Sequence, residues 1–204
     1  YGWEESEYPS KWIEEFNYFL DGITVMSNYV KKTLIDNGLS IPIKVTHLGV
    51  DHMKNRSENG QLTINDKKFK FLHISSCFPR KGISQLIKSY SDNFSIDDDV
   101  SLIIKTFNNP HNNLYKILND AIEENNNFPH VQIIDDDISD IDIKQLYMAS
   151  NVLVAPSCGE GFCLPIAEAM LLNIPVITTG WGGQIDFCNN DNSWLIDYQL
   201  KYSS

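Results

Sequence analysis

The stretch that decides the fold runs from residue 152 to residue 170 and reads Val152-Leu-Val-Ala-Pro-Ser-Cys-Gly-Glu-Gly-Phe-Cys-Leu-Pro-Ile-Ala-Glu-Ala-Met170. Its first part, Val152–Ala155, is apolar throughout, as expected of a strand buried on both faces of a parallel sheet. Pro165 suits the first turn of a helix, where its missing N–H costs nothing, and the pattern predicts that helix over Pro165–Leu172. The residues between are then a strand-to-helix loop, the unit from which α/β sheets are built.

The same alternation continues along most of the chain. Short apolar runs predict strands, and amphipathic runs of helical period predict helices between them. Right-handed crossovers then give a doubly wound parallel sheet, whose ligands bind in the loops outside the carboxyl ends of the strands. The further strands are predicted at Phe69–Ser75, Val100–Thr106, Val131–Ile134 and Val176–Thr178, and the further helices at Gly82–Tyr90, Leu114–Glu124 and Ile141–Ala149.

The N-terminal residues follow a different pattern. Apolar residues at helical spacing predict a helix over Ser10–Leu20, and Ile23–Met26 reads as a short strand. Ser27 is a suitable N-cap for a second helix, which Gly38 would end.

Composition limits the classes of function. The chain has 204 residues, of which 42% are hydrophobic, so it can hold one large domain, or one domain and part of another. Its 16 Lys and Arg against 27 Asp and Glu give a net charge of −11, which argues against nucleic acid or an anionic membrane as a general partner. No stretch approaches the roughly 20 apolar residues of a transmembrane segment. The four cysteines lack metal-type spacing and are interpreted as reduced packing thiols of a cytosolic protein.

Two glutamates mark the loop and helix quoted above as a candidate site. Glu160 lies in the loop and Glu168 lies in the following helix, and both side chains could face one cleft. A carboxylate accepts two hydrogen bonds side by side, which suits a pair of sugar or ribose hydroxyls, and the free N–H groups at the helix start suit an anion. The alternative is that Glu168 only complements the helix dipole and Glu160 is a solvated loop residue.

Two further loops follow predicted strands. Arg80 and Lys81 stand just before a helix, where a mobile ammonium and a planar guanidinium would meet a diphosphate; the alternative is a solvated basic pair. The loop does not resemble a Walker motif or a G-x-G-x-x-G turn, so ATP hydrolysis and NAD are disfavoured. The third loop holds Gly180, Gly182 and Gly183, which permit close approach to a ligand or serve only as a turn.

Taken together, these loops resemble the donor-binding half of retaining glycosyltransferases with the two-domain GT-B fold, the glycosyl transferases group 1 type. The signature of that family is a Glu, seven residues and a second Glu, usually within an E-G-F-G-L-P context. Further blocks resemble the branch that acts in bacterial polysaccharide and surface-glycan assembly. The matching blocks include Pro79-Arg-Lys-Gly82, Glu160 to Met170, Ile174-Pro-Val-Ile177, Trp3-Glu-Glu-Ser6, Gly49-Val-Asp-His52 and Trp181-Gly-Gly.

The resemblance assigns a role to each matching residue. Lys81, helped by Arg80, would bind the donor diphosphate, and Glu168 would bind the nucleotide ribose. Glu160 and the backbone of the loop after it would hold the donor sugar and phosphate, and the base would lie against Asp137 and Ile138. The loop residues concerned are Gly161, Phe162, Cys163 and Leu164. Three residues depart from the family pattern: Ser76, where many relatives carry Arg, and Cys163 and Asn173, where Gly is common.

The resemblance also implies the wider setting of the chain. Residues 1–40 would be the remnant of an N-terminal acceptor domain with its linker, and residues 41–204 the Rossmann-like domain that binds the nucleotide sugar. The activity would be that of a retaining, mannosyltransferase-like hexosyltransferase. Its partners would be a nucleotide diphosphate sugar, a glycan or lipid-linked acceptor and the missing acceptor domain, with no metal or other cofactor. The expected location is the cytoplasm, with peripheral contact to the inner membrane through the full-length protein.

Two other readings stay open from the sequence. The chain could be a module that binds a nucleotide sugar but performs no chemistry alone. It could also be a nucleotide-sugar epimerase of the same two-domain architecture, a reading that the Trp-Glu-Glu-Ser and Pro-Arg-Lys-Gly blocks disfavour.

Overall fold

The computed structural model describes residues 3–56 and 60–200, and its centre is a parallel sheet of six strands. The strand order is β5-β4-β3-β6-β7-β8, with every neighbouring pair parallel. With β3 counted as the first strand, this is the 3-2-1-4-5-6 order of a doubly wound Rossmann sheet, so the predicted fold class is confirmed. The strands are β3 (Phe69–Ile74), β4 (Val100–Lys105), β5 (Val131–Ile134), β6 (Val152–Ala155), β7 (Val176–Thr179) and β8 (Trp194–Ile196).

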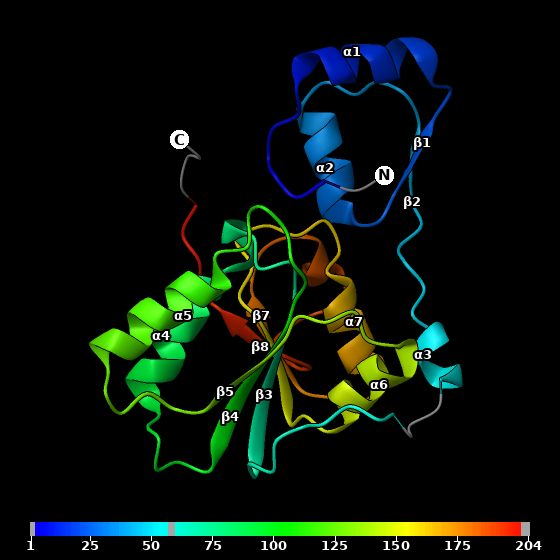
Figure 1. Cartoon of the computed structure of the whole chain (residues 1–204). Coiled ribbons are helices and arrows are strands. Elements are labelled where there is room, and N and C mark those ends of the chain that lie inside the picture. The colour runs from blue at the N-terminus through cyan, green and yellow to red at the C-terminus, as the bar shows by residue number, and fades with distance from the viewer. Residues whose placement is uncertain (1–2, 57–59, 201–204) are drawn as a thin grey trace.

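Helices cover both faces of this sheet (Figure 1). One face carries α4 (Ile83–Asn93) and α5 (Leu114–Glu124), and the other carries α3 (His52–Asn55), α6 (Asp140–Met148) and α7 (Leu164–Leu171). One apolar cluster lies between the sheet and the helices on each of its two faces. All four residues of β6 are buried, which explains why this strand is apolar throughout.

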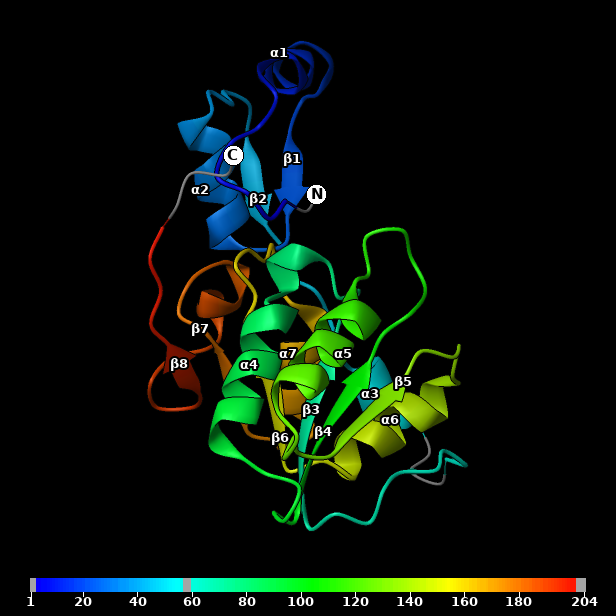
Figure 2. The same cartoon turned by 60° about the vertical axis from the view of Figure 1, so that its left-hand side comes forward.

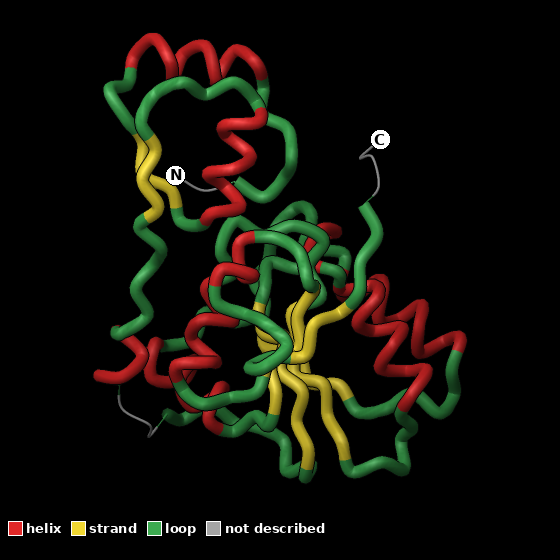
Figure 3. Tube along the Cα trace, turned by 180° about the vertical axis from the view of Figure 1, so that it is seen from behind, coloured by secondary structure: helices red, strands yellow, loops and turns green. Residues whose placement is uncertain are grey.

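The N-terminal residues form a separate small unit with its own core (Figure 3). Strand β1 pairs in parallel with β2, and two helices pack on them. The elements are α1 (Ser10–Phe19), β1 (Ile23–Val25), α2 (Asn28–Asp36) and β2 (Ile43–Val45). The expected boundary between residues 40 and 41 falls just before β2, which belongs with β1. That these residues derive from an acceptor domain stays a prediction, and residues 1–2, 57–59 and 201–204 lie outside the described part.

The sequence pattern located most elements. The predictions for β5, β6 and α5 match the observed bounds, and the Ser27 hydroxyl caps α2 by accepting a hydrogen bond from the amide of Val30 at 3.2 Å. Helix α4 begins one position later than predicted, because Gly82 adopts a left-handed conformation, and it continues past Tyr90 to Asn93. The pattern did not reveal β2, α3, β8, or the 3-10 turns η1 (Pro79–Lys81) and η2 (Gly183–Asp186).

Two smaller expectations concern cysteines and membrane segments. All four cysteines are free thiols; Cys77, Cys163 and Cys188 are buried, and Cys158 is exposed. Among the described residues, no helix combines the length and the apolar character needed to cross a bilayer.

Candidate functional site

The candidate site is a cavity at the carboxyl ends of β3, β4 and β6, where the strand order reverses. In doubly wound sheets this switch point is where ligands bind. The N-terminal unit lies beyond the same end of the sheet (Figure 2). The cavity has a volume of about 320 Å³, and its lining includes Ser75, Ser76, Arg80, Lys81, Lys105, Ser157, Glu160, Cys163 and Pro165.

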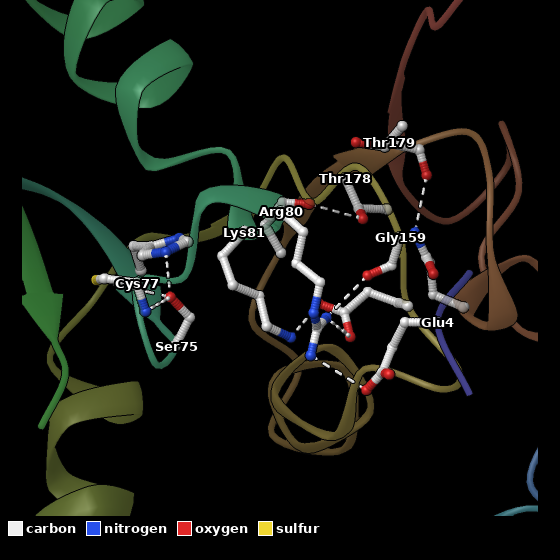
Figure 4. A network of polar contacts seen from close by, with 12 residues as sticks. Glu4, Ser75, Cys77, Arg80, Lys81, Gly159, Thr178 and Thr179 are labelled. Atoms are coloured by element: carbon white, nitrogen blue, oxygen red, sulfur yellow. Dashed lines mark hydrogen bonds and ion pairs between the residues drawn. The ribbon is translucent and has the colours of Figure 1, made fainter. Parts of the chain in front are cut away.

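An ion pair stands at the centre of this cavity. The ammonium of Lys81 donates a hydrogen bond to Oε1 of Glu160 at 2.6 Å, and the Glu160 side chain is only 6% exposed. Arg80 lies beside them and donates to the carbonyl of Gly159 at 3.0 Å and to Oε1 of Glu4 at 3.1 Å (Figure 4). Lys81, predicted to bind the diphosphate, and Glu160, predicted to hold the sugar, therefore share a cavity and form an ion pair with each other.

The turn that carries Arg80 and Lys81 depends on Gly82. Its φ of 72° is in the left-handed region, and a Cβ added there would lie 2.1 Å from the carbonyl oxygen of Pro156. The amide of Cys158 also donates to the carbonyl of Arg80 at 2.7 Å. The basic loop after β3 and the acidic loop after β6 are thus packed directly against each other.

The start of α7 forms another wall of the cavity. Cys163 is its N-cap with a φ of 66°, and Pro165 lies in the first turn as predicted. Burial raises the pKa of the Cys163 thiol well above its ordinary value, and the nearby Glu160 carboxylate acts in the same direction. The thiol is therefore neutral, and the start of α7 contributes the positive end of its helix dipole to this wall.

Glu168 faces a different set of partners. Its Oε1 lies 2.9 Å from Nε2 of His52, and its Oε2 accepts a hydrogen bond from the Tyr147 hydroxyl at 2.8 Å. Burial, followed by the Glu168 charge, raises the Tyr147 pKa well above its ordinary value, so the hydroxyl keeps its proton and donates it. The structure thus places Glu160 in the cavity lining. Glu168 lies within α7 and outside that lining.

Unlike Cys163, four further residues predicted to bind the donor lie outside the cavity lining: Gly161, Phe162, Leu164 and Ile138. A Cβ on Gly161 would lie 2.6 Å from the carbonyl oxygen of Trp3, so this glycine permits the approach of the N-terminal unit. Phe162 packs on Phe187 with ring centroids 5.0 Å apart. Leu164 is 37% exposed, and Ile138 packs against the core on the α6 and α7 side of the sheet.

The glycine-rich loop after β7 supports the acidic loop. The amide of Gly183 donates to the carbonyl of Glu160 at 2.7 Å, and a Cβ on Gly183 would lie 1.9 Å from the carbonyl oxygen of Gly161. The sequence left two interpretations of this loop, close approach to a ligand or a turn alone. The structure shows that Gly183 allows the loop to approach the backbone of the acidic loop closely.

Two cavity residues were missed by the sequence analysis. His73 and Lys105 were read only as members of strands, yet both are buried and line the cavity. The His73 Nδ1 lies 2.8 Å from the carbonyl of Val154, and its Nε2 lies 2.8 Å from the Ser75 hydroxyl. The signal that could have revealed them is a titratable residue in the last two positions of a strand, next to the edge of the sheet where ligands bind.

These features define a class of protein: a doubly wound α/β chain with basic and acidic loops meeting at its switch point. Residues 54–199 match the family model described as "Glycosyl transferases group 1", which covers well over half of the chain. The chain therefore belongs to the glycosyl transferases group 1 family.

Two curated relatives are glycosyltransferases. An uncharacterized glycosyltransferase of Methanocaldococcus jannaschii is 29% identical over 164 residues, which cover 80% of this chain and 41% of the relative. The capsular polysaccharide biosynthesis glycosyltransferase CapM of Staphylococcus aureus is 27% identical over 186 residues, covering 85% of this chain and 47% of CapM. The chain thus spans less than half the length of either relative.

Solved structures share the fold. Anabaena HepE, in a complex with UDP and glucose, superposes with a TM-score of 0.74 at 20% identity, covering 93% of this chain and 54% of HepE. Sucrose-phosphate synthase from Thermosynechococcus elongatus gives a TM-score of 0.71 at 18% identity, covering 96% of this chain and 50% of that protein. At this identity the likeness establishes the GT-B type of fold.

Proposed function

We propose that this chain is the donor-binding half of a retaining glycosyltransferase, and that its cavity holds the diphosphate of a nucleotide sugar. The observation that carries the proposal is the meeting of Lys81, Arg80 and Glu160 at the switch point of the sheet, beside the N-terminus of α7. Cations and free amides at one end of a cavity suit a diphosphate, and a carboxylate beside them suits sugar hydroxyls. The complex of HepE with UDP and glucose supports this class of ligand.

Each site residue has a defined part in this proposal. Lys81 exchanges its contact with Glu160 for one shared with the diphosphate, and Glu160 then accepts hydrogen bonds from the donor sugar. Arg80 turns from Glu4 toward the phosphates. The backbone of Gly161, Phe162 and Cys163 and the adjoining Leu164 follow the sugar and phosphate, Glu168 binds the ribose, and the base lies along Ile138.

The reaction breaks the bond between the anomeric carbon and the terminal phosphate oxygen and forms a bond from that carbon to an acceptor hydroxyl. The electron pair of the broken bond leaves with the nucleotide diphosphate, and the proton of the acceptor hydroxyl passes to an oxygen of that diphosphate. Charge therefore grows on the diphosphate as the bond breaks. Lys81 and the start of α7 stabilise that charge, and the cavity positions the reacting groups.

Nucleotide diphosphate binding tests the proposal. UDP, GDP and ADP are screened for a rise in melting temperature, since a ligand that binds only the folded state stabilises it. Calorimetric titration then compares the wild type with Lys81→Ala and Glu168→Ala, each expected to weaken binding severalfold. Lys88→Ala, on the exposed side of α4, is the matched control and retains wild-type affinity. Wild-type affinity in both site variants would overturn the proposal.

The proposed reaction needs no metal ion. The titrations are therefore run with and without a chelator, and equal affinities are expected. Loss of binding on chelation would contradict this part of the proposal.

The sequence also left open a second candidate, a nucleotide-sugar binding module without chemistry of its own. Donor hydrolysis and sugar transfer distinguish the two. We expect this chain to bind donor and a chain extended by an acceptor domain to transfer sugar. For the full-length protein we propose a glycan or lipid-linked acceptor, a role in polysaccharide assembly, and a place at the cytoplasmic side of the inner membrane. The similarity to CapM supports the role in polysaccharide assembly.

A further inference from the structure

Lys105 is a buried cation that lines the cavity but has no assigned role. It ends β4, where its backbone pairs with Ile74 of β3, and its residue exposure is 9%. Its carbonyl accepts a hydrogen bond from the amide of Ser75 at 3.1 Å. Both Lys105 and Ser75 belong to the cavity lining together with Lys81.

The three cavity cations differ in their partners. Lys81 is ion-paired with Glu160, and Arg80 is ion-paired with Glu4. Lys105 has no carboxylate within ion-pair distance among the described residues; its ammonium donates to two carbonyl oxygens, those of Thr106 and Asp136. Lysine has three N–H donors, so one remains for a ligand.

A buried ammonium without an ion-pair partner is costly, because burial removes its hydration. Burial lowers the pKa of Lys105, while the charges of Asp137, Asp135 and Asp136 act against that shift. A neutral side chain could fill the same space at lower cost. A charged side chain such as Lys105, at the carboxyl end of a strand and lining a cavity, is instead typical of a group that binds a ligand.

The loop that follows Lys105 is tied to the loop after β3. The Asn109 amide donates to the carbonyl of Ser76 at 2.9 Å, and Asn112 donates to the Thr106 hydroxyl at 3.0 Å. These contacts hold the end of β4 beside Ser75 and Ser76, on the side of the cavity opposite the Glu160 loop in the strand order β4-β3-β6. A cation at the end of β4 would therefore approach a ligand in the cavity from the β4 side. Arg80 and Lys81 would approach it from the turn that follows β3.

We propose that Lys105 is a further donor-binding residue, which contacts the phosphates of the nucleotide sugar from the end of β4. This inference rests on the proposed function of the cavity. In this arrangement the diphosphate is held between Lys105 on one side and Lys81 on the other. Glu160 pairs with Lys81, so the charge of Lys105 is the one that Glu160 does not neutralise.

Paired titrations test this role. UDP, GDP and ADP, and the nucleoside of each, are titrated into the wild type, Lys105→Met, Lys105→Arg and Lys67→Met. Lys67 is the matched control because it also donates to a backbone carbonyl, that of Asp98, near the opposite end of the sheet. We expect Lys105→Met to weaken the diphosphate about tenfold and the nucleoside less than twofold. Lys105→Arg recovers part of the affinity, and Lys67→Met retains all of it.

Other outcomes overturn the inference. Wild-type diphosphate affinity in Lys105→Met refutes the contact but leaves the proposed function standing. An equal loss of nucleoside affinity assigns Lys105 to loop structure and also refutes it. A wild-type chain that binds none of the three diphosphates refutes the proposed function itself.

A measurement on the unmodified chain covers the case in which Lys105→Met does not fold. The Cε signal of Lys105, assigned through Lys105→Arg, is followed by NMR as the best-binding nucleotide diphosphate is added. A shift that saturates with binding is expected. An unmoved Lys105 signal, with Lys81 shifting, would refute the contact.

Discussion

At the scale of single residues, the contact between Lys81 and Glu160 bears on both the stability of the loops and the proposed activity. Both side chains are largely buried, and each is the other's counter-ion. Removing one partner of such a pair leaves an uncompensated buried charge, so the pair also stabilises the loops that carry it. In the proposed function, a diphosphate in the cavity would take over the role of Glu160 toward Lys81 and free that carboxylate for the donor sugar.

His73 makes stability depend on pH. Burial lowers its pKa from 6.5 to about 4, so the imidazole is neutral in the folded chain and bonds the Val154 carbonyl and the Ser75 hydroxyl. Between pH 6.5 and pH 4 the unfolded chain binds a proton at this position that the folded chain does not. The free energy of unfolding therefore falls as the pH is lowered, by about 3 kcal/mol over this range.

The variant His73→Gln isolates that effect. Glutamine keeps one donor and one acceptor but does not titrate, so the variant is expected to lose about 3 kcal/mol less than the wild type between pH 6.5 and pH 4. Urea unfolding at several pH values measures the difference. Parallel pH profiles for the two proteins would contradict the assignment of a neutral buried imidazole.

The sequence predicted part of the site at this scale. Arg80, Lys81 and Glu160 could be found because charged residues stand in loops after apolar strands. Glu168 was predicted to face the same cleft, but spacing along a helix does not reveal that its oxygens contact His52 and Tyr147. Each oxygen makes one of these contacts and keeps a further lone pair for a ribose hydroxyl. Lys105 was hidden because a charged residue inside a strand pattern reads as an exposed strand position.

At the scale of elements, the 3-10 turn before α4 sets the position of both basic side chains. Gly82 closes this turn against Pro156, and we expect Gly82→Ala to strain the backbone and push the loops apart. The predicted cost is about 2 kcal/mol of folding free energy, together with weaker nucleotide diphosphate binding.

Gly49→Ala is the matched control for that variant. A Cβ at Gly49 meets nothing within 4 Å, so this substitution is expected to change stability by less than about 0.5 kcal/mol. Urea unfolding and calorimetry are applied to both variants. If Gly82→Ala were as stable as Gly49→Ala and bound diphosphate equally well, the turn would not control the site.

The elements themselves were largely predictable from periodicity. Strands such as β6 and helices such as α5 have several apolar positions at one period, which outweighs local exceptions. The missed strands β2 and β8 have three residues each and are bordered by polar loops, so their pairing depends on neighbours distant in the chain. Three residues are too few to establish a period of two.

At the scale of the whole molecule, the N-terminal unit is joined to the sheet by specific contacts. The Ser27 hydroxyl donates to the carbonyl of Gly161 at 2.6 Å, and the amide of Asn28 donates to Oδ2 of Asp186 at 2.7 Å. Tyr29 meets Trp181 edge-on with ring centroids 5.7 Å apart. These contacts involve the acidic loop and η2, so the N-terminal unit helps to shape the candidate site.

Ser27 tests this coupling because one hydroxyl both caps α2 and reaches Gly161. Ser27→Ala is expected to lower the free energy of unfolding by about 2 kcal/mol. Ser89→Ala, at an exposed position on α4, is the control and is expected to change it by less than about 0.5 kcal/mol. Far-UV circular dichroism and tryptophan fluorescence should report one shared transition, whereas separate transitions would show that the two units unfold independently.

The central claim is that the cavity at the carboxyl ends of β3, β4 and β6 holds the diphosphate of a nucleotide sugar. A crystal structure of the chain with the nucleotide diphosphate that stabilises it most tests this directly. We expect phosphate density between η1 and the first turn of α7, with Lys81 released from Glu160 and in contact with a phosphate oxygen. Phosphates bound elsewhere, with the Lys81–Glu160 pair intact, would contradict it.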